Sequence, residues 1–144
     1  MPKPAAALMT LADVRAFLDR EFPQISHGDM AMQVEAVGAM SCRMRMPFHA
    51  RYLRPGGTIS GPSMFALADV ALYVAILAQI GPVALTVTTS LNINFLKKPG
   101  HSDLIGECRL LKLGRRLAVG EVSLFSDQSA DMVAHATGTY SIPG

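Results

Sequence analysis

Tryptophan is absent from this 144-residue chain, only six phenylalanines and three tyrosines are present, and there are only two cysteines. So few cysteines exclude a disulfide-dense scaffold, and the fold must instead be held by a hydrophobic core. Charge is also scarce, because 17% of the residues are charged and the formal net charge is +2. This small, scattered positive excess gives no sign of a DNA or RNA partner, although it suits an anionic small molecule. With half of its residues hydrophobic, the chain is expected to form one domain over residues 1–144.

The cysteines and histidines show no metal-binding or catalytic pattern. Cys42 and Cys108 lie in periodic apolar runs, with no CxxC motif and no histidine at metal-ligand spacing. We expect buried free thiols in a reducing compartment rather than a disulfide or a nucleophile. The histidines are spread along the chain without acidic partners, so none is assigned to catalysis and no metal site is expected. They are His27, His49, His101 and His135.

No segment of the chain reads as a membrane span. The N-terminal ten residues lack the apolar stretch of a signal peptide. The apolar segment from Met64 to Ile80 is shorter than the roughly 20 residues that a crossing needs, and it contains Asp69 and Gln79. We therefore expect a soluble cytoplasmic protein with no membrane partner.

Hydrophobic periodicity predicts an N-terminal helix, one strand, a long buried helix and then four strands. Residues 11–22 have apolar side chains at helical spacing, and residues 38–48 alternate with a period of two. The long helix begins at Gly61 and Pro62 and ends before Gly81, and apolar residues on nearly every side of it indicate that a sheet wraps it. The later strands are expected within residues 83–96, 101–113, 117–126 and 132–142.

Asp69 is the only charged residue between Pro55 and Leu96, so the most apolar part of the chain contains a single carboxylate. Burial of an unpaired carboxylate is costly, so this group is either paired with a distant partner or kept for chemistry. Asp69 is therefore the first candidate for a catalytic residue. The alternative is a structural carboxylate that only accepts hydrogen bonds.

Four segments of the chain, in this order, resemble the hotdog-fold acyl-CoA thioesterases, in particular the phenylacetate-pathway and 4-hydroxybenzoyl-CoA enzymes. The segments are GTISGPSMFALADVA, SLNINFLKKPG, LGRRLAVGEVSLFSD and VAHATGTY. The resemblance covers about residues 30–142. It implies an α+β hotdog fold, in which an antiparallel sheet wraps around a long central helix, with a short N-terminal helix added.

The resemblance also implies roles for two residues of the central helix. Asp69 would be the catalytic carboxylate, which either attacks the thioester carbonyl or activates a water that does. The backbone N–H of Gly61 would polarise the thioester oxygen, because the first N–H groups of a helix are unpaired and carry the positive end of its dipole. Such sites lie between two subunits in this family, so a homodimer is implied, and pairs of dimers are common. No cofactor is implied beyond the coenzyme A of the substrate.

Three positions near the start of the long helix depart from the family's pattern. Ser60 stands where the family has a histidine, Pro62 where it has a second glycine, and Arg54 where it often has Asn or Gln. Pro62 has no N–H to donate, so the oxyanion is left to Gly61 and Ser63. Arg54 either pairs with the catalytic carboxylate across the interface or binds a substrate anion.

Further candidates lie on the strands that follow the long helix. Thr88 is on the strand where some relatives have a Ser or Thr facing the catalytic water, but it is also an ordinary strand residue. Asn92 either lines the site, in place of the missing amide, or caps the strand edge. Basic residues at the expected strand ends either contact the phosphates of coenzyme A or lie in solvated turns. They are Lys97, Lys98, Arg115 and Arg116.

The sequence therefore predicts an acyl-CoA thioesterase that hydrolyses a thioester of coenzyme A to the free acid and CoA. The alternative is a non-catalytic hotdog module that binds acyl-CoA or only dimerises. A hotdog dehydratase is disfavoured, because the central helix offers no pair of a histidine and an acid. The acyl group is not predicted, since Met32, Met64, Phe65 and Tyr73 suit an aromatic or a medium-length aliphatic chain equally well.

Overall fold

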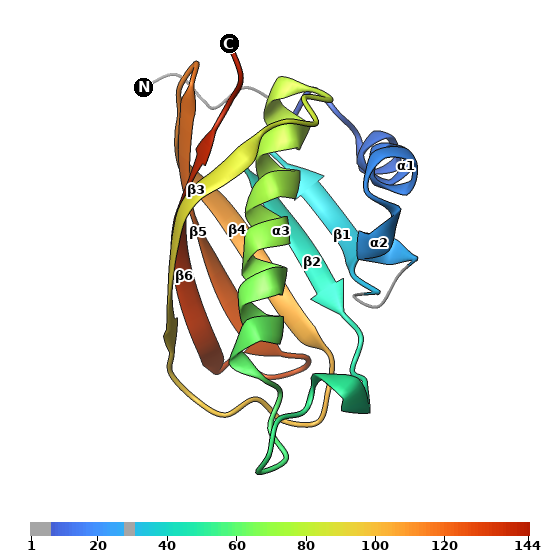
Figure 1. The fold of residues 1–144 in the computed structure, drawn as a ribbon, viewed down its shortest axis with the longest axis vertical. Helices are drawn as coiled ribbons and strands as arrows, with labels where there is room; N and C mark the ends of the chain where they lie inside the picture. The colour runs from blue at the N-terminus through green and yellow to red at the C-terminus, as the bar shows by residue number, and fades with distance from the viewer. Residues whose placement is uncertain (1–6, 28–30) are drawn as a thin grey trace.

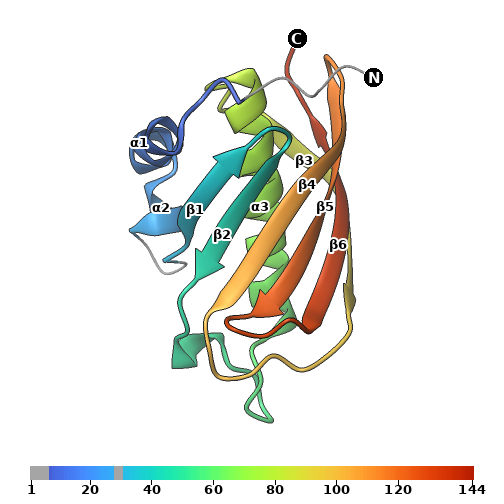
Figure 2. The ribbon, with the colours of Figure 1, turned by 180° about the vertical axis from the view of Figure 1, so that it is seen from behind.

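The computed structural model describes residues 7–27 and 31–144. Six antiparallel strands form one sheet that curves around a long central helix, and two short helices lie beside one edge of the sheet (Figures 1 and 2). The strand order is β1-β2-β4-β5-β6-β3. This arrangement confirms the predicted α+β hotdog fold. The elements are α1 (Leu11–Glu21), α2 (Pro23–Ser26), β1 (Gln33–Gly38), β2 (Ser41–Met46), a 3-10 turn (Ala50–Tyr52), α3 (Gly61–Ile80), β3 (Val87–Phe95), β4 (Leu104–Leu113), β5 (Leu117–Ser126) and β6 (Met132–Ser141).

The central helix α3 has the predicted bounds because both of its ends carry strong signals. Ser60 is its N-cap, Pro62 lies in its first turn, and Gly81 follows its last residue with φ 99°, a conformation that favours glycine. By length and composition alone, α3 could cross a membrane, so the prediction that this segment is too short was wrong. However, 67% of its most apolar window is buried inside the protein, as in a core helix. Residues 1–6 of the N-terminal stretch lie outside the described residues.

The single strand predicted over residues 38–48 is in fact the second strand of a hairpin. β2 has the expected alternation, with Cys42, Met44 and Met46 buried and the arginines between them partly exposed. The preceding strand β1 was not predicted. The chain turns between Gly38 and Ser41, where Met40 has φ 55°. β2 therefore pairs with β1 along one edge and with β4 along the other. The four-residue helix α2, which Pro23 begins, was also not predicted.

The sheet approaches α3 very closely at two glycines. A Cβ at Gly120 on β5 or at Gly138 on β6 would lie 2.6 Å from a side-chain carbon of Leu72. Such a contact is too short for a real side chain, so the lack of a Cβ lets the middle of the sheet pack on Leu72, which is fully buried. These glycines thereby set how tightly the sheet wraps the helix.

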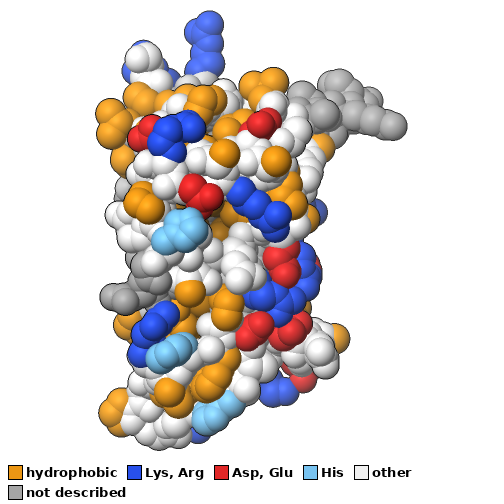
Figure 3. All heavy atoms as spheres, turned by 90° about the vertical axis from the view of Figure 1, so that its right-hand side faces the viewer, with side chains coloured by type: hydrophobic (Ala, Val, Ile, Leu, Met, Phe, Trp, Pro, Cys, Tyr) orange, Lys and Arg blue, Asp and Glu red, His pale blue; other side chains and the backbone are white. Residues whose placement is uncertain are grey.

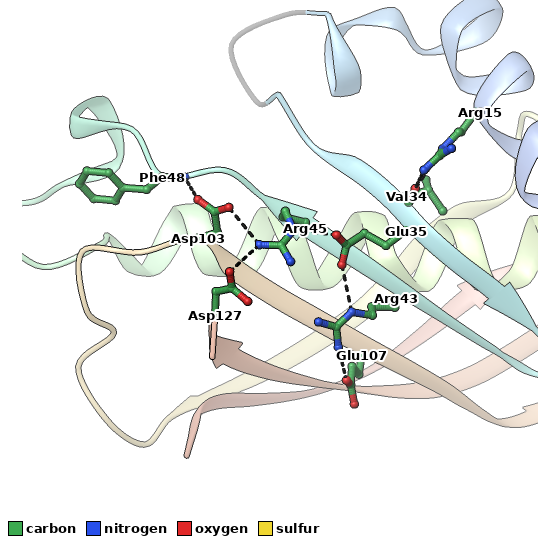
Figure 4. A network of polar contacts seen from close by, with 9 residues as sticks. All are labelled: Arg15, Val34, Glu35, Arg43, Arg45, Phe48, Asp103, Glu107 and Asp127. Atoms are coloured by element: carbon green, nitrogen blue, oxygen red, sulfur yellow. Dashed lines mark hydrogen bonds and ion pairs between the residues drawn. The ribbon is translucent and has the colours of Figure 1, made fainter. Parts of the chain in front are cut away.

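Basic and acidic side chains pair with each other on the outer face of the sheet (Figure 4). Arg45 binds Glu35 at 2.7 Å, Asp127 at 2.8 Å and Asp103 at 3.0 Å, and Arg43 also binds Glu35, at 3.0 Å. Hydrogen bonding to Arg45 lowers the pKa of the carboxyl groups of Glu35 and Asp127. Seen from the side of α1 and β1, basic and acidic side chains are interspersed (Figure 3). This face therefore carries no large patch of one sign.

The two cysteines lie opposite each other on neighbouring strands. Cys42 on β2 pairs with Cys108 on β4, and both side chains are buried free thiols, as predicted. The Cys42 thiol donates to the carbonyl oxygen of Ala71 at 3.1 Å. Contact with Cys108 and burial raise the pKa of the Cys42 thiol, so it stays protonated and is a poor nucleophile.

One stripe of α3 is not covered by the sheet. Pro62, Phe65, Ala66 and Asp69 all remain at least partly accessible, and they share one face because they are spaced three or four residues apart. The expectation of burial on nearly every side was therefore wrong for the first half of α3. We call these four residues the open stripe.

The strand next to the open stripe is also incompletely covered. Within residues 7–27 and 31–144, β3 is hydrogen-bonded only to β6, so its other edge has no strand partner there. Val87 and Phe95, at the two ends of β3, are 51% and 53% exposed, and Phe65 of the open stripe is 40% exposed. Exposed apolar side chains beside a free strand edge are typical of an interaction surface.

Candidate functional site

The Asp69 carboxylate is held by two hydroxyl groups. Thr88 Oγ1 donates to Asp69 Oδ1 at 2.6 Å, and the Tyr140 hydroxyl lies 2.6 Å from the same oxygen and 2.7 Å from the Asp69 backbone carbonyl oxygen. Thr88 on β3 and Tyr140 on β6 are cross-strand partners. Leu91 and Ile93 pack toward the core, so strict alternation along β3 would point Thr88 away from α3. A register shift between Thr88 and Ser90 interrupts the alternation, and Thr88 points at α3 instead.

These contacts leave one carboxylate oxygen of Asp69 available. Among the residues that the structure describes, Asp69 forms no ion pair and its Oδ2 accepts no hydrogen bond. Tyr140 is 3% exposed, and burial and the neighbouring Asp69 raise the pKa of its phenol, so the hydroxyl remains a donor. The carboxylate is thus oriented through Oδ1 and free at Oδ2.

The contact between Tyr140 and Asp69 was not predicted. Tyr140 ends the segment VAHATGTY, where it is the only aromatic residue on an alternating strand, so a signal was present. The contact spans 71 residues of sequence and forms only because β6 lies between β5 and β3. Thr88 thus contacts Asp69 directly, whereas the predicted chemical roles of both residues stay predictions.

A cavity of about 450 Å³ opens beside Asp69, and we call it the Asp69 cavity. Three of the chain's nine aromatic residues line it, with the ring centroids of Phe22 and Tyr73 6.1 Å apart and those of Tyr73 and Tyr140 6.4 Å apart. The size is within the usual range for a small-molecule pocket. The lining residues are Glu21, Phe22, Ala66, Asp69, Val70, Tyr73, Ala84, Thr86, Val87, Thr88 and Tyr140.

A second cavity, of about 730 Å³, lies at the N-terminus of α3, and we call it the cationic cavity. Arg54, Lys97 and Lys98 are exposed side chains on its lining, and no acidic residue is among the described residues that line it. Lys97 is partly neutralised by an ion pair with Asp131 at 2.6 Å. The remaining lining residues are Thr58, Ile59, Ser60, Gly61, Pro62, Met64, Phe95, Leu96 and Pro99.

The start of α3 leaves a single backbone donor at this cavity. Ser60 caps the helix by accepting a hydrogen bond from the N–H of Ser63 at 3.3 Å, and the two hydroxyls are 2.9 Å apart. The Ser63 N–H, predicted as a possible oxyanion donor, is therefore already used, and Pro62 has none. Within the described part of the chain, the Gly61 N–H has no protein acceptor. A Cβ at Gly61 would lie 3.1 Å from the ring of Phe95, so a larger residue there would displace that ring.

The structure does not bring the two predicted halves of the site together within one chain. Gly61 and Asp69 are eight residues apart on α3, which corresponds to about 12 Å along the helix axis. Of the other predicted residues, Arg54, Ser60, Pro62 and Lys97 line the cationic cavity and Thr88 lines the Asp69 cavity, with Ser63 serving the helix cap.

Three predicted residues lie outside both cavities. Asn92 is exposed on β3 and, by alternation with the core-packed Leu91 and Ile93, points away from α3. Arg115 and Arg116 are exposed in the turn between β4 and β5. That turn is at the opposite end of β4 from the segment that contains Lys97 (Figure 1).

Two histidines have acidic partners, but the described residues contain no group of side chains that could hold a metal ion. His27 contacts Asp19 at 2.8 Å and His135 contacts Glu121 at 3.3 Å, so the expectation that no histidine has an acidic partner was wrong. Both pairs lie outside the two cavities. Over residues 7–27 and 31–144, no three His, Cys, Asp or Glu side chains gather in a way that could hold a metal ion.

Comparison with known proteins gives one family match. The model of the Thioesterase superfamily matches residues 56–133, which is more than half of the chain. This range includes Gly61, Asp69 and Thr88 but not Tyr140. A curated relative named "putative esterase", from Saccharolobus solfataricus, is 32% identical over 98 residues. That match covers 68% of this chain and 64% of the relative, so the chain spans less than two thirds of the relative's length.

Two solved structures extend the similarity over nearly the whole chain. A "putative thioesterase" from Silicibacter sp. TM1040 is 46% identical with a TM-score of 0.87, and the alignment covers 96% of this chain and 94% of that one. A "putative thioesterase, phenylacetic acid degradation-related protein" from Ralstonia eutropha JMP134 is 26% identical with a TM-score of 0.79. In that case the alignment covers 90% of this chain and 98% of the other.

Proposed function

Because this chain belongs to the Thioesterase superfamily, we propose that it is an acyl-CoA thioesterase, which hydrolyses a thioester of coenzyme A to the free acid and CoA. The observation that carries the proposal is the Asp69 carboxylate, which is oriented through Oδ1 and free at Oδ2 beside a cavity. A fixed carboxylate with one free oxygen suits either a nucleophile or a general base.

Both chemical routes use the free Oδ2 of Asp69. As a base, Oδ2 takes a proton from water while the water oxygen adds to the thioester carbonyl, and the departing CoA sulfur takes that proton. As a nucleophile, Oδ2 adds to the carbonyl and expels the CoA thiolate, and water then hydrolyses the resulting mixed anhydride. Single turnover in ¹⁸O-water distinguishes the routes, because only the nucleophilic route can place the label in Asp69. Neither route needs a metal or a redox cofactor.

The oxygen of the thioester carbonyl becomes negatively charged in either route. The Gly61 N–H is suited to stabilise it, because it has no acceptor among the described residues and lies at the positive end of a 20-residue helix. Since about 12 Å separates Gly61 from Asp69 along α3, we propose that Asp69 of one protomer works with Gly61 of the partner subunit. The proposed site therefore exists twice in a homodimer and is incomplete in a monomer.

The free edge of β3 and the open stripe support this dimer. If two β3 strands pair antiparallel about a two-fold axis near Leu91, Thr88 comes next to the opposite end of the partner's β3. Within each chain that end carries Phe95, whose ring packs on Gly61. The pairing would therefore bring the Asp69 cavity of one protomer against the cationic cavity of the other. It would also cover the exposed Phe65, Val87 and Phe95. A pair of such dimers, a homotetramer, is the larger assembly that we propose.

The charges of the two cavities suggest how the substrate lies. Arg54, Lys97 and Lys98 surround the cationic cavity and suit the phosphates of coenzyme A. The described residues that line the Asp69 cavity include no basic residue, so this cavity is left for the acyl group. Arg115 and Arg116 remain an alternative phosphate contact only if the partner subunit brings them to the site.

Thiol release from a panel of acyl-CoA esters tests the proposal. Wild-type protein should release CoA from at least one ester, and Asp69→Asn should abolish most of that activity. Sedimentation should show a dimer or larger species at micromolar concentration. Tight binding of acyl-CoA without turnover would instead favour the alternative function, a non-catalytic binding module. A stable folded monomer that hydrolyses the esters would contradict the shared site.

A further inference from the structure

One hydroxyl group in the Asp69 cavity has no partner. Thr86 precedes β3 and is only 3% exposed, and its Oγ1 is enclosed without a hydrogen-bond partner among the described residues. Its backbone N–H is used, donating to the carbonyl oxygen of Val83 at 3.1 Å. A buried hydroxyl without a partner is unfavourable, and such groups are rare in folded proteins. Thr86 is also the only such side chain over residues 7–27 and 31–144.

The other hydroxyl groups that line the cavity are already committed. Tyr73 donates to the carbonyl oxygen of Ala84 at 3.1 Å, and Thr88 and Tyr140 both contact Asp69. Among the described lining residues, Thr86 therefore has the only hydroxyl without a hydrogen-bond partner. A rotation about its χ1 angle changes the direction of the hydroxyl without backbone movement, and Thr86 lines the cavity.

The charge of the cavity restricts what that ligand can be. Among the described lining residues, Asp69 and Glu21 are the only ionisable groups besides the two tyrosines, and none is basic. Arg20, which is not among them, pairs with Glu21 at 3.3 Å, and both side chains are largely exposed. Glu21 is the last residue of α1, where the negative end of the helix dipole adds to its charge. Burial first, and then the charge of Glu21, raise the pKa of Tyr73, so this charge is felt inside the cavity. A carboxylate on the acyl group would be repelled by both acids.

We propose that the Asp69 cavity selects an uncharged acyl group that carries a hydroxyl or carbonyl oxygen. Thr86 donates a hydrogen bond to that oxygen, and Glu21 disfavours acyl chains that end in a carboxylate. The inference rests on the proposed function, since it assigns the acyl end of the substrate to this cavity. It names two specificity residues that take no part in the chemistry itself.

Four-carbon CoA esters that differ only in polarity test both residues. The panel is butanoyl-CoA, 3-hydroxybutanoyl-CoA, 4-hydroxybutanoyl-CoA and succinyl-CoA. We expect the wild type to have kcat/KM about tenfold higher for one hydroxylated ester than for butanoyl-CoA. Succinyl-CoA should be several-fold worse than butanoyl-CoA, and this difference should shrink at high salt.

Two variants assign these preferences. Thr86→Val keeps the shape of the side chain and should remove the preference, so that the ratio of kcat/KM for the hydroxylated ester to kcat/KM for butanoyl-CoA falls from about ten to about one. Glu21→Gln should raise the ratio of kcat/KM for succinyl-CoA to kcat/KM for butanoyl-CoA several-fold. Thermal unfolding of each variant checks that it is folded. A preference for the hydroxylated ester that survives in Thr86→Val, or equal rates for succinyl-CoA and butanoyl-CoA in the wild type, would overturn the proposal.

A binding experiment separates this inference from the proposed hydrolysis. The same four chains are attached to coenzyme A through a thioether, which cannot be hydrolysed, and their affinities are measured by calorimetry. The same order of affinity in a protein that hydrolyses no ester would support the acyl subsite while refuting the hydrolase function. Equal affinities in a protein that does hydrolyse the esters would refute the subsite alone.

Discussion

Replacing Asp69 by asparagine should abolish turnover while leaving the fold intact. Asparagine has the same shape as aspartate, and its side-chain oxygen can accept from Thr88 and Tyr140 in the place of Oδ1. The amide nitrogen then takes the place of Oδ2 toward the cavity, where it can neither attack a carbonyl nor accept a proton. We therefore expect kcat to fall by on the order of 10² or more.

The effect on stability can be worked from the same contacts. A hydrogen bond to a charged group contributes about 1.5–3 kcal/mol and one to a neutral group about 0.5–1.5 kcal/mol, so two weakened bonds cost roughly 2–3 kcal/mol. This loss is offset because a neutral amide is easier to bury than a carboxylate. The net change should be about 1 kcal/mol in either direction, which shifts Tm by a few degrees. Asp69→Asn is thus expected to lose most of its activity while its Tm changes by only a few degrees.

The assay measures thermal unfolding and thiol release on the same preparation of each protein. Asp19→Asn is the matched control, because it makes the same chemical change at an exposed acid on α1 that lines neither cavity. The control should keep full activity. If Asp69→Asn hydrolyses acyl-CoA within tenfold of the wild type per folded molecule, the carboxylate is structural and the catalytic assignment is refuted.

Three further outcomes are expected. Tyr140→Phe should lower kcat about tenfold with little change in KM, because the carboxylate of Asp69 keeps only one of its two orienting hydroxyls; stopped-flow or steady-state thiol release measures this. Lys98→Ala should weaken binding of free coenzyme A, more so at low salt, whereas Arg115→Ala should not unless the partner brings that residue to the site. Arg45→Met should make the free energy of unfolding less dependent on pH below about 4.5, since the carboxyl groups bound to Arg45 have lowered pKa values in the folded state. The stabilising effect of these carboxyl groups is complete above the pKa of the unfolded state and is lost as pH falls through the pKa of the folded state. Urea titrations should therefore show that the wild type loses more stability on acidification than Arg45→Met does.

Local signals in the sequence were sufficient for much of the fold. Gly61, Pro62 and Gly81 marked both ends of α3, because each residue suits only certain backbone positions at helix termini. The alternation in residues 117–126 matched β5 to the residue, since a half-buried strand has a strict period of two. The hairpin turn at Met40 was missed because a positive φ at methionine has no sequence signature.

The candidate site was harder to predict because its contacts are not local. The carboxylate of Asp69 was found from charge alone, but its partner Tyr140 depends on the strand order, which no short pattern encodes. Ser60 was noted only as standing in the place of the family's histidine, although Ser60 and Ser63 have the spacing of a helix cap. The open stripe was missed because uniform apolar composition does not reveal which side of a helix a partner covers.

The long neutral segment around Asp69 explains why the two cavities differ in charge. Asp69 is the only charged residue from Pro55 to Leu96, and Arg54 and Lys97 are the charges that flank this segment. α3 and β3 run in opposite directions, so both ends of the neutral segment lie near the N-terminal end of α3 (Figure 1). Arg54 and Lys97, which flank the segment, therefore line the same cavity. Asp69 is left about 12 Å away along the helix, with only neutral side chains between. A monomer therefore keeps its acid and its cations apart, and a two-fold related copy is the simplest arrangement that would place the acid of one chain beside the cations of the other.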